Sequence, residues 1–250
     1  MEITTRIIKG GALLEDSRRF VDEWDARRGP EENLEEFRSR NVLGKRSRSR
    51  AEDALAILRQ RFVQPGPEIV RALKVLAVWP DAFRAACYYE AARNDDLLAY
   101  TAGEILYASR QRGWIRVAVE DVERALLEVP PGPAVKEWGE STRRRVIHGL
   151  LSALRDFEVL EGRATKHLAR PHMPFAGFVY VLGRLRPRLA SSHEIVTSSA
   201  WRWWLLDDHH VRSLFLDADR EGLLHFSEAG TTVRIDWRTD GLEEMVRAVA

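Results

Sequence analysis

The sequence DDHHVRSLFLDADREGLLHFSEAGTTVRIDWR, residues 207–238, decides which kind of fold to expect. Its first half follows a helical period, with one apolar face formed by Val211, Leu214, Phe215 and Ala218. After the apolar run 223–226 and a turn at 228–230, apolar and charged residues alternate between Val233 and Trp237, which is typical of a strand with one buried face. Helix, strand, turn and strand in this order form the back half of a winged helix.

Helical periodicity dominates the rest of the chain. After an extended start at residues 3–8, the apolar spacing predicts helices over about 14–27, 34–40, 50–62, 68–79, 81–92, 95–111, 120–128, 141–157, 175–186 and 242–249. Residues 68–79 are apolar on nearly all sides, so they are expected to form the central buried helix. A hairpin turning at Gly162 follows helix 141–157 and gives a second, weaker copy of the helix–hairpin pattern.

We therefore expect a mainly α protein, a helical bundle with winged-helix-type units that carry short β-hairpins. The proline-rich stretch Pro130-Pro131-Gly132-Pro133 is typical of a linker. It divides the chain into an N-terminal helical bundle domain, residues 1–130, and a C-terminal helical domain with winged-helix-like hairpins, residues 131–250.

The composition is that of a folded globular protein, with 45% hydrophobic and 31% charged residues. No apolar run approaches the length needed to cross a bilayer, and the first residues lack the apolar core of a secretory signal. The lone cysteine, Cys87, cannot form an internal disulfide and lies in an apolar segment. These features indicate a cytoplasmic protein without a membrane partner.

The formal net charge of +1 conceals a segregated distribution. Residues 38–50 contain six cations and no acid, a local charge of +6, and residues 141–188 carry a local charge of +7. The remainder of the chain must therefore be strongly acidic. Arginine outnumbers lysine, and its guanidinium binds phosphate oxygens with two parallel N–H groups. The pattern favours a polyanion such as nucleic acid as partner, although scattered surface arginines are the alternative.

Both clusters supply residues expected to contact double-stranded DNA. They are Arg38, Arg40, Lys45, Arg46, Arg48, Arg50, Arg143, Arg144, Arg145, His148, Arg155, Arg163 and Lys166. Helix 141–157 is expected to face DNA more than helix 208–221, because the arginines of the latter stand beside Asp217 and Asp219, which repel phosphate.

The cluster at 38–50 allows two interpretations. Ser47 or Ser49 caps the helix that follows, and the free N–H groups of that helix end favour an anion, so the arginines there form a phosphate clamp. Alternatively, Glu52, Asp53 or the acidic segment 31–36 neutralises the cluster internally.

No motif for catalysis is present in the sequence. Gly44-Lys45 lacks the earlier glycine of a nucleotide-binding loop, and one cysteine cannot build a thiolate zinc site. The run Asp207-Asp208-His209-His210 is better explained as a helix start, because adjacent residues on a helix point in different directions. We expect no catalytic residues, no metal and no cofactor.

Several stretches in order resemble the BrxA family of BREX bacteriophage-defence systems. They are IKGGALLE (8–15), RNVLGK (40–45) with the arginines after it, the helix near Arg50, the alanine-rich segment before Tyr88, and STRRR (141–145) running into LRD (154–156). The resemblance implies a compact helical protein with NusB-like and winged-helix character that binds double-stranded DNA, acts without known catalysis and assembles with other BREX components. The expected function is therefore non-enzymatic DNA binding, mainly through phosphates. A protein-interaction adaptor and an RNA-binding protein remain alternatives, and a homo-oligomer is left open.

Overall fold

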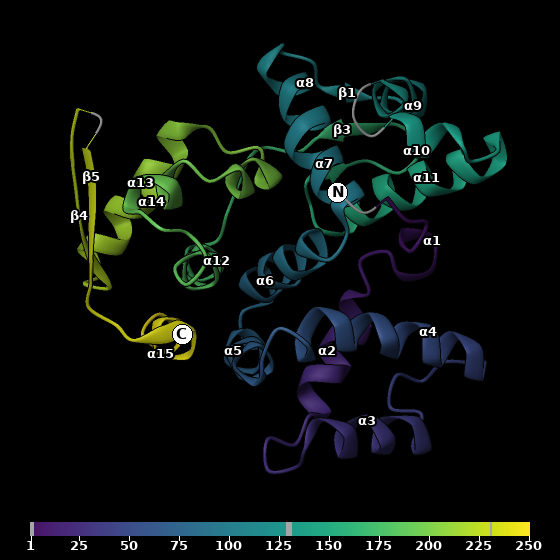
Figure 1. Cartoon of the computed structure of the whole chain (residues 1–250), viewed down its shortest axis with the longest axis horizontal. Helices are drawn as coiled ribbons and strands as arrows, with labels where there is room; N and C mark the ends of the chain where they lie inside the picture. The colour runs from purple at the N-terminus through teal and green to yellow at the C-terminus, as the bar shows by residue number, and fades with distance from the viewer. Residues whose placement is uncertain (1–2, 129–131, 231) are drawn as a thin grey trace.

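The computed structural model describes residues 3–128, 132–230 and 232–250 of the chain, and this part is mainly helical (Figure 1). The α-helices are α1 (Ile7–Gly10), α2 (Leu14–Glu23), α3 (Pro30–Ser39), α4 (Arg48–Leu58), α5 (Pro67–Leu76), α6 (Pro80–Arg93), α7 (Asp96–Tyr100), α8 (Tyr107–Gln111), α9 (Val119–Leu127), α10 (Gly132–Lys136), α11 (Glu140–Asp156), α12 (Phe175–Leu185), α13 (Ser192–Val196), α14 (Asp208–Arg220) and α15 (Gly241–Arg247). The strands are β1 (Arg116–Val117), β2 (Leu160–Glu161), β3 (Lys166–Leu168), β4 (Leu224–Ala229) and β5 (Thr232–Trp237). The predicted class, mainly α with short hairpins, is confirmed.

Local sequence signals fix several helix starts. Pro67 and Pro80 occupy the first turn of α5 and α6, where the fixed φ of proline suits the helix and its missing N–H costs nothing. Ser47 caps α4 by accepting a hydrogen bond from the Arg50 N–H at 3.3 Å. Asp95 caps α7 in the same way with two backbone N–H groups. Of the two caps predicted for α4, Ser47 or Ser49, the structure has Ser47.

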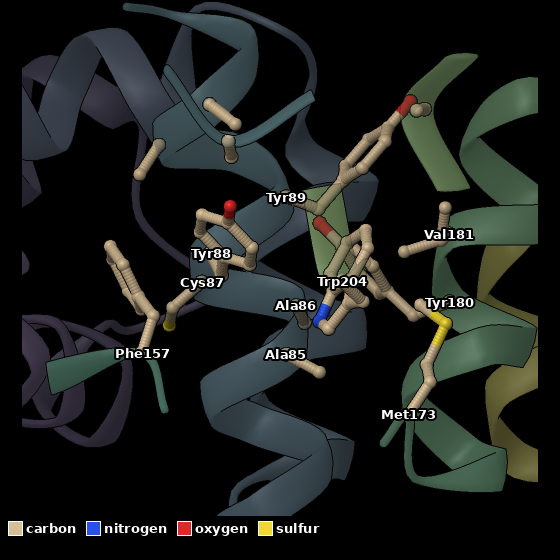
Figure 2. Close-up of a cluster of buried hydrophobic side chains, with 14 of the residues drawn as sticks. Ala85, Ala86, Cys87, Tyr88, Tyr89, Phe157, Met173, Tyr180, Val181 and Trp204 are labelled. Atoms are coloured by element: carbon tan, nitrogen blue, oxygen red, sulfur yellow. The ribbon is translucent and has the colours of Figure 1, made fainter. Parts of the chain in front are cut away.

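The buried side chains form one continuous core with α6 at its centre. Tyr88 of α6 stacks on Phe157 with ring centroids 4.8 Å apart, and it meets Trp204 edge-on at 5.0 Å. Figure 2 shows Phe157 on one side of α6 and Tyr180 of α12 on the other. The alanines of α6 are short enough to let neighbouring helices approach closely from several sides.

The prediction that residues 68–79 form the central buried helix is therefore wrong. α5 ends at Leu76, and beyond it Val78 and Trp79 are 71% and 51% exposed. Pro80 begins a new helix in a new direction, so the apolar residues just before it no longer follow the buried face of α5.

The two predicted hairpins are present. β2 and β3 are antiparallel and turn at Gly162, whose φ of +85° suits a residue without a Cβ. β1 also pairs with β3, which gives a three-stranded sheet of order β1-β3-β2. Along the chain this unit runs helix (α7–α8), strand (β1), helices (α9, the short α10, and α11), then two strands (β2 and β3).

The second hairpin, β4–β5, follows α14 and lies at one edge of the molecule (Figure 1). A turn was expected at residues 228–230, but β4 continues to Ala229, which pairs with Thr232. Pairing of Glu228 with Val233 keeps the ladder regular up to this point and leaves a tighter connection. Thr231, predicted as the first residue of the second strand, lies outside the described residues.

Several other boundaries differ from expectation, among them the end of α2 at Glu23 rather than near residue 27. Residues 7–10 form α1 rather than an extended segment, because Ile7 turns inward and is 2% exposed. α3 begins at Pro30, well before the predicted Leu34, since proline starts helices readily. Gly139, not Ser141, is the N-cap of α11. The predicted domain boundary between residues 130 and 131 lies outside the described residues and stays a prediction.

Candidate nucleic-acid interface

The first half of the cluster at residues 38–50 is neutralised within the protein. Arg38 lies 3.3 Å from both Glu35 and Glu52. Lys45 lies 2.6 Å from the carboxylate of Asp16 on α2. These contacts match the interpretation in which acids of the same chain balance the cluster.

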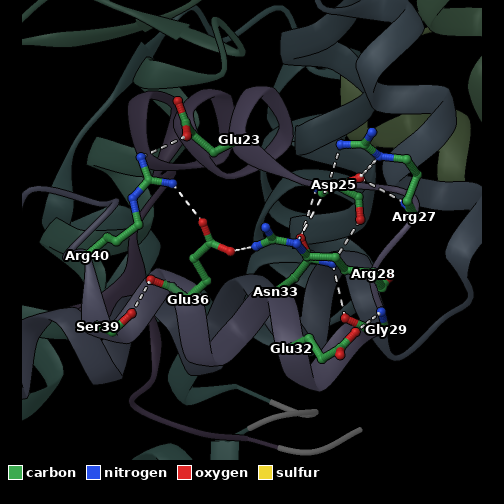
Figure 3. A network of polar contacts seen from close by, with 10 residues as sticks. All are labelled: Glu23, Asp25, Arg27, Arg28, Gly29, Glu32, Asn33, Glu36, Ser39 and Arg40. Carbon is green, nitrogen blue, oxygen red and sulfur yellow. Dashed lines mark hydrogen bonds and ion pairs between the residues drawn. The ribbon is translucent and has the colours of Figure 1, made fainter.

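Arg40 belongs to the same neutralised half. Its guanidinium lies between Glu36 at 2.8 Å and Glu23 at 3.8 Å (Figure 3). Glu36 also pairs with Arg28, so two arginines share one carboxylate. Arg40 therefore joins α2 to α3 rather than offering an unpaired charge to a ligand.

The second half of the cluster is not neutralised. Arg46, Arg48 and Arg50 are exposed, and no carboxylate of the described residues lies within ion-pair distance of them. They surround the N-terminus of α4, whose first turn contains no acid to complement the helix dipole. The clamp interpretation therefore fits Arg46–Arg50, and internal pairing fits the residues before them.

Helix α11 divides the second cluster in a similar way. Arg143 is directed inward, where it lies 3.2 Å from Glu123 of α9 and donates to the Trp138 carbonyl. Arg155 pairs with its neighbour Asp156 at 2.6 Å. The cations nearer the C-terminal end of this segment, Arg184 and Arg186, are also engaged within the fold, so the local charge of +7 overstates the charge available to a ligand.

The outward side of α11 keeps its charge. Arg144 is exposed and makes only a long 3.7 Å contact with Glu140. Arg145 and His148 are exposed without a carboxylate partner among the described residues. The opposite face of α11 is buried through Ile147, Leu150, Leu151 and Leu154.

The β2–β3 hairpin adds two cations beside α11. Arg163 is exposed near the tip, and the Lys166 ammonium donates to the Arg163 carbonyl at 2.9 Å. Partial burial and the nearby charge of Arg155 lower the pKa of Lys166. The hairpin and the helix thus bring like charges together across the β2–α11 contact.

Helix α14 has much less free charge. Arg212 makes two hydrogen bonds to the Glu228 carboxylate, at 3.1 and 2.9 Å, and Arg220 pairs with Asp217 at 2.9 Å. Within the described residues, no group of three or more His, Cys, Asp or Glu side chains could hold a metal ion, and no helix is long and apolar enough to span a membrane.

The structure brings the two clusters together at one groove. Arg46 and Arg50, at the start of α4, line it opposite Arg145 of α11. Lys9 of α1 also lines the groove, and the sequence did not predict it because it lies far from both arginine clusters along the chain. Arg38, Arg40 and Arg143 do not line this groove.

Residues 1–180 match the sequence model of one protein family, BrxA. The chain belongs to the BrxA family. Membership makes it a component of a BREX bacteriophage-defence system. The BrxA match includes every residue predicted to contact DNA and the whole β1-β3-β2 unit, and it ends within α12. No curated protein matches the chain.

Proposed function

We propose that this BrxA-family chain is a non-enzymatic, cytoplasmic subunit that holds double-stranded DNA through phosphate contacts within the defence system. Its DNA-contacting unit runs from α7 to β3 and is a winged helix, with α11 as the helix that enters the major groove and β2–β3 as the wing. The NusB-like character implied by the family resemblance and a homo-oligomeric state stay predictions.

The order of elements supports the winged-helix assignment. Helix, strand, the helices α9, α10 and α11 and two strands, with the first strand beside the last, bring α11 and the hairpin to the same end of the unit. In DNA-binding proteins of the helix-turn-helix class, the helix in the position of α11 lies in the major groove. Its exposed residues would then meet the duplex first.

The observation that carries the proposal is the exposed charge on this end of the unit, where Arg144 makes one long 3.7 Å contact with Glu140 and Arg145 and Arg163 have no carboxylate partner among the described residues. Arg144, Arg145, His148 and Arg163 are exposed, whereas the arginines of α14 are held by carboxylates. α11 contains no Asn or Gln, the side chains that pair with adenine. Contacts made mainly with phosphates position a protein on a duplex without reading its sequence.

The test compares unrelated duplexes of equal length over a range of salt concentration. We expect similar affinities for all sequences and a steep loss of affinity with salt, because bound cations release counterions from the duplex. Arg144→Glu combined with Arg163→Glu should weaken binding and lower the salt slope by roughly 0.9 per lost phosphate contact. Arg220→Glu on α14 is the matched control and should bind like the wild type. Absence of binding at low salt would refute the proposal.

The adaptor function is a second candidate for the α14–β5 unit. Leu216 on α14 is 45% exposed, and the neighbouring arginines are already paired. The paired arginines leave this surface little free charge for phosphate, and Leu216 adds an apolar side chain to it. Leu216→Asp should then abolish co-purification with the other components of the same defence system while duplex affinity stays unchanged, and unchanged co-purification would reject this candidate.

A further inference from the structure

The short helix α1 holds the two cationic clusters next to one another. It contacts α4 on one side and α11 on the other, as Figure 1 shows. Two glycines permit the close approach: a Cβ on Gly10 would lie 2.9 Å from the Ile57 side chain of α4. A Cβ on Gly149 of α11 would lie 3.4 Å from the Ile7 carbonyl. Residues about a hundred positions apart in sequence therefore share one surface.

A groove of about 690 Å³ lies where these helices meet. Its charged lining consists of Lys9, Lys45, Arg46, Arg50 and Arg145, with Asp53 as the acid. The cations come from three separate segments of the chain, α1, the start of α4 and α11.

Internal ion pairs account for only part of this charge. Asp53 lies 3.0 Å from Lys9, and Asp16 lies 2.6 Å from Lys45. The guanidinium groups of Arg46, Arg50 and Arg145 have no carboxylate partner among the described residues. Three unpaired like charges around one groove repel one another, and an anion in the groove removes this repulsion.

The groove lies on the side of α11 that adjoins its outward face. At the helical repeat, Arg145 is only about 60° around the helix from His148. A helix in the major groove, which is about 12 Å wide, has a sugar-phosphate backbone along each flank. The backbone flanking α11 on the Arg145 side would therefore run toward Arg46 and Arg50.

We propose that this composite groove binds the sugar-phosphate backbone of the same duplex that α11 contacts, so that one duplex touches both arginine clusters of one chain. The inference rests on the proposed function; it adds Lys9 to the expected DNA-binding residues and assigns Arg46, Arg50 and Arg145 to one stretch of the same duplex. It also assigns α1 a role, because α1 sets the spacing between the two sets of phosphate contacts.

The test uses the full chain and a labelled duplex of about two helical turns. The slope of log affinity against log salt concentration falls by roughly 0.9 for each phosphate contact that is lost. Arg46→Glu combined with Arg50→Glu should therefore lower this slope by the value of roughly two contacts, and Arg145→Glu by that of roughly one. The triple variant should show the sum of these losses. Arg220→Glu combined with Arg234→Glu, which changes two exposed arginines of the α14–β5 unit, is the control and should bind like the wild type. Thermal unfolding of each variant checks that the fold is intact.

Titration of the chain with duplex to saturation then measures the number of duplexes bound per chain, which decides whether one duplex contacts both clusters. One duplex per chain supports the inference, and two duplexes per chain overturn it. The inference also fails if the wild type binds duplex and Arg144→Glu weakens it, while the groove variants bind normally. If the wild type does not bind at low salt, the proposed function fails instead. Stronger competition by duplex RNA than by duplex DNA would overturn the assignment to DNA.

Discussion

Replacing Glu90 by glutamine should destabilise the protein strongly. Glu90 lies on α6, fully buried, and its Oε1 accepts hydrogen bonds from the Tyr180 hydroxyl at 2.8 Å and from Arg184 Nε at 2.7 Å. Its Oε2 accepts from a second Arg184 nitrogen at 3.3 Å. Both partners lie on α12, so this one carboxylate joins the two helices at the centre of the core.

The magnitude follows from what the substitution leaves behind. The new amide side chain would be neutral, and the Arg184 guanidinium, only 5% exposed, would be buried without a countercharge. Breaking one partner of a buried ion pair costs about 3–5 kcal/mol. Each kcal/mol shifts Tm by about 2–4 °C in a chain of this size, so we expect a loss of roughly 6–20 °C. Tyr180→Phe removes one hydrogen bond to a charged group and should cost about 1.5–3 kcal/mol.

Urea and thermal unfolding followed by circular dichroism measure these changes. The double variant Glu90→Leu with Arg184→Met removes both charges and should recover most of the stability lost in Glu90→Gln, because paired apolar replacements of a buried ion pair are often tolerated. A loss below about 1 kcal/mol in Glu90→Gln would contradict the reasoning, since such a value is typical of a solvent-exposed ion pair. So would a double variant less stable than the single one.

Three further outcomes are expected. Arg46→Ala combined with Arg48→Ala should leave thermal stability unchanged or slightly higher, while the salt dependence of duplex binding becomes less steep. Lower thermal stability with unchanged duplex affinity would show that these arginines do not form a phosphate clamp. Ser47→Ala should cost about 0.5–2 kcal/mol in urea unfolding through loss of the α4 cap, whereas the exposed Ser49→Ala should cost almost nothing. A backbone hydrogen bond from α14 lowers the pKa of Asp207. The ionised carboxylate therefore stabilises the fold above about pH 4, and this contribution is lost as the pH falls through the lowered pKa. Asp207→Asn should therefore be less stable at neutral pH by about 0.3–1 kcal/mol, and the gap should close in acid.

Signals confined to a few neighbouring residues were sufficient for much of the fold. The cap at Ser47 or Ser49, the turn at Gly162 and the alternation before Trp237 are local signals, and each predicted its element correctly. Val78 was predicted to be buried and is exposed, because its environment depends on more than the residues near it in sequence. Its burial depended on where α6 begins and which way it runs, and periodicity does not contain that direction.

The candidate interface was predictable only as two basic segments. Arg38 and Arg46 look alike in sequence, yet Arg38 meets Glu52 across the α3–α4 contact while Arg46 meets no acid among the described residues. Which arginines remain unpaired depends on how helices pack, and so does the approach of Arg145 to Arg46. Charge counts along the chain therefore located the two clusters but could not predict that they lie next to one another in the folded protein.

The contact between α15 and α5 has a consequence for synthesis in the cell. α15 packs on α5 and α12, and Arg71 of α5 lies 2.7 Å from Glu243 of α15. A ribosome adds about 5–20 residues per second, so roughly 10–35 s separate the emergence of these two helices. During that interval the apolar surface that α15 covers is open to solvent. We therefore expect this apolar surface of α5 and α12 to be open to non-native contacts in the nascent chain until α15 has emerged.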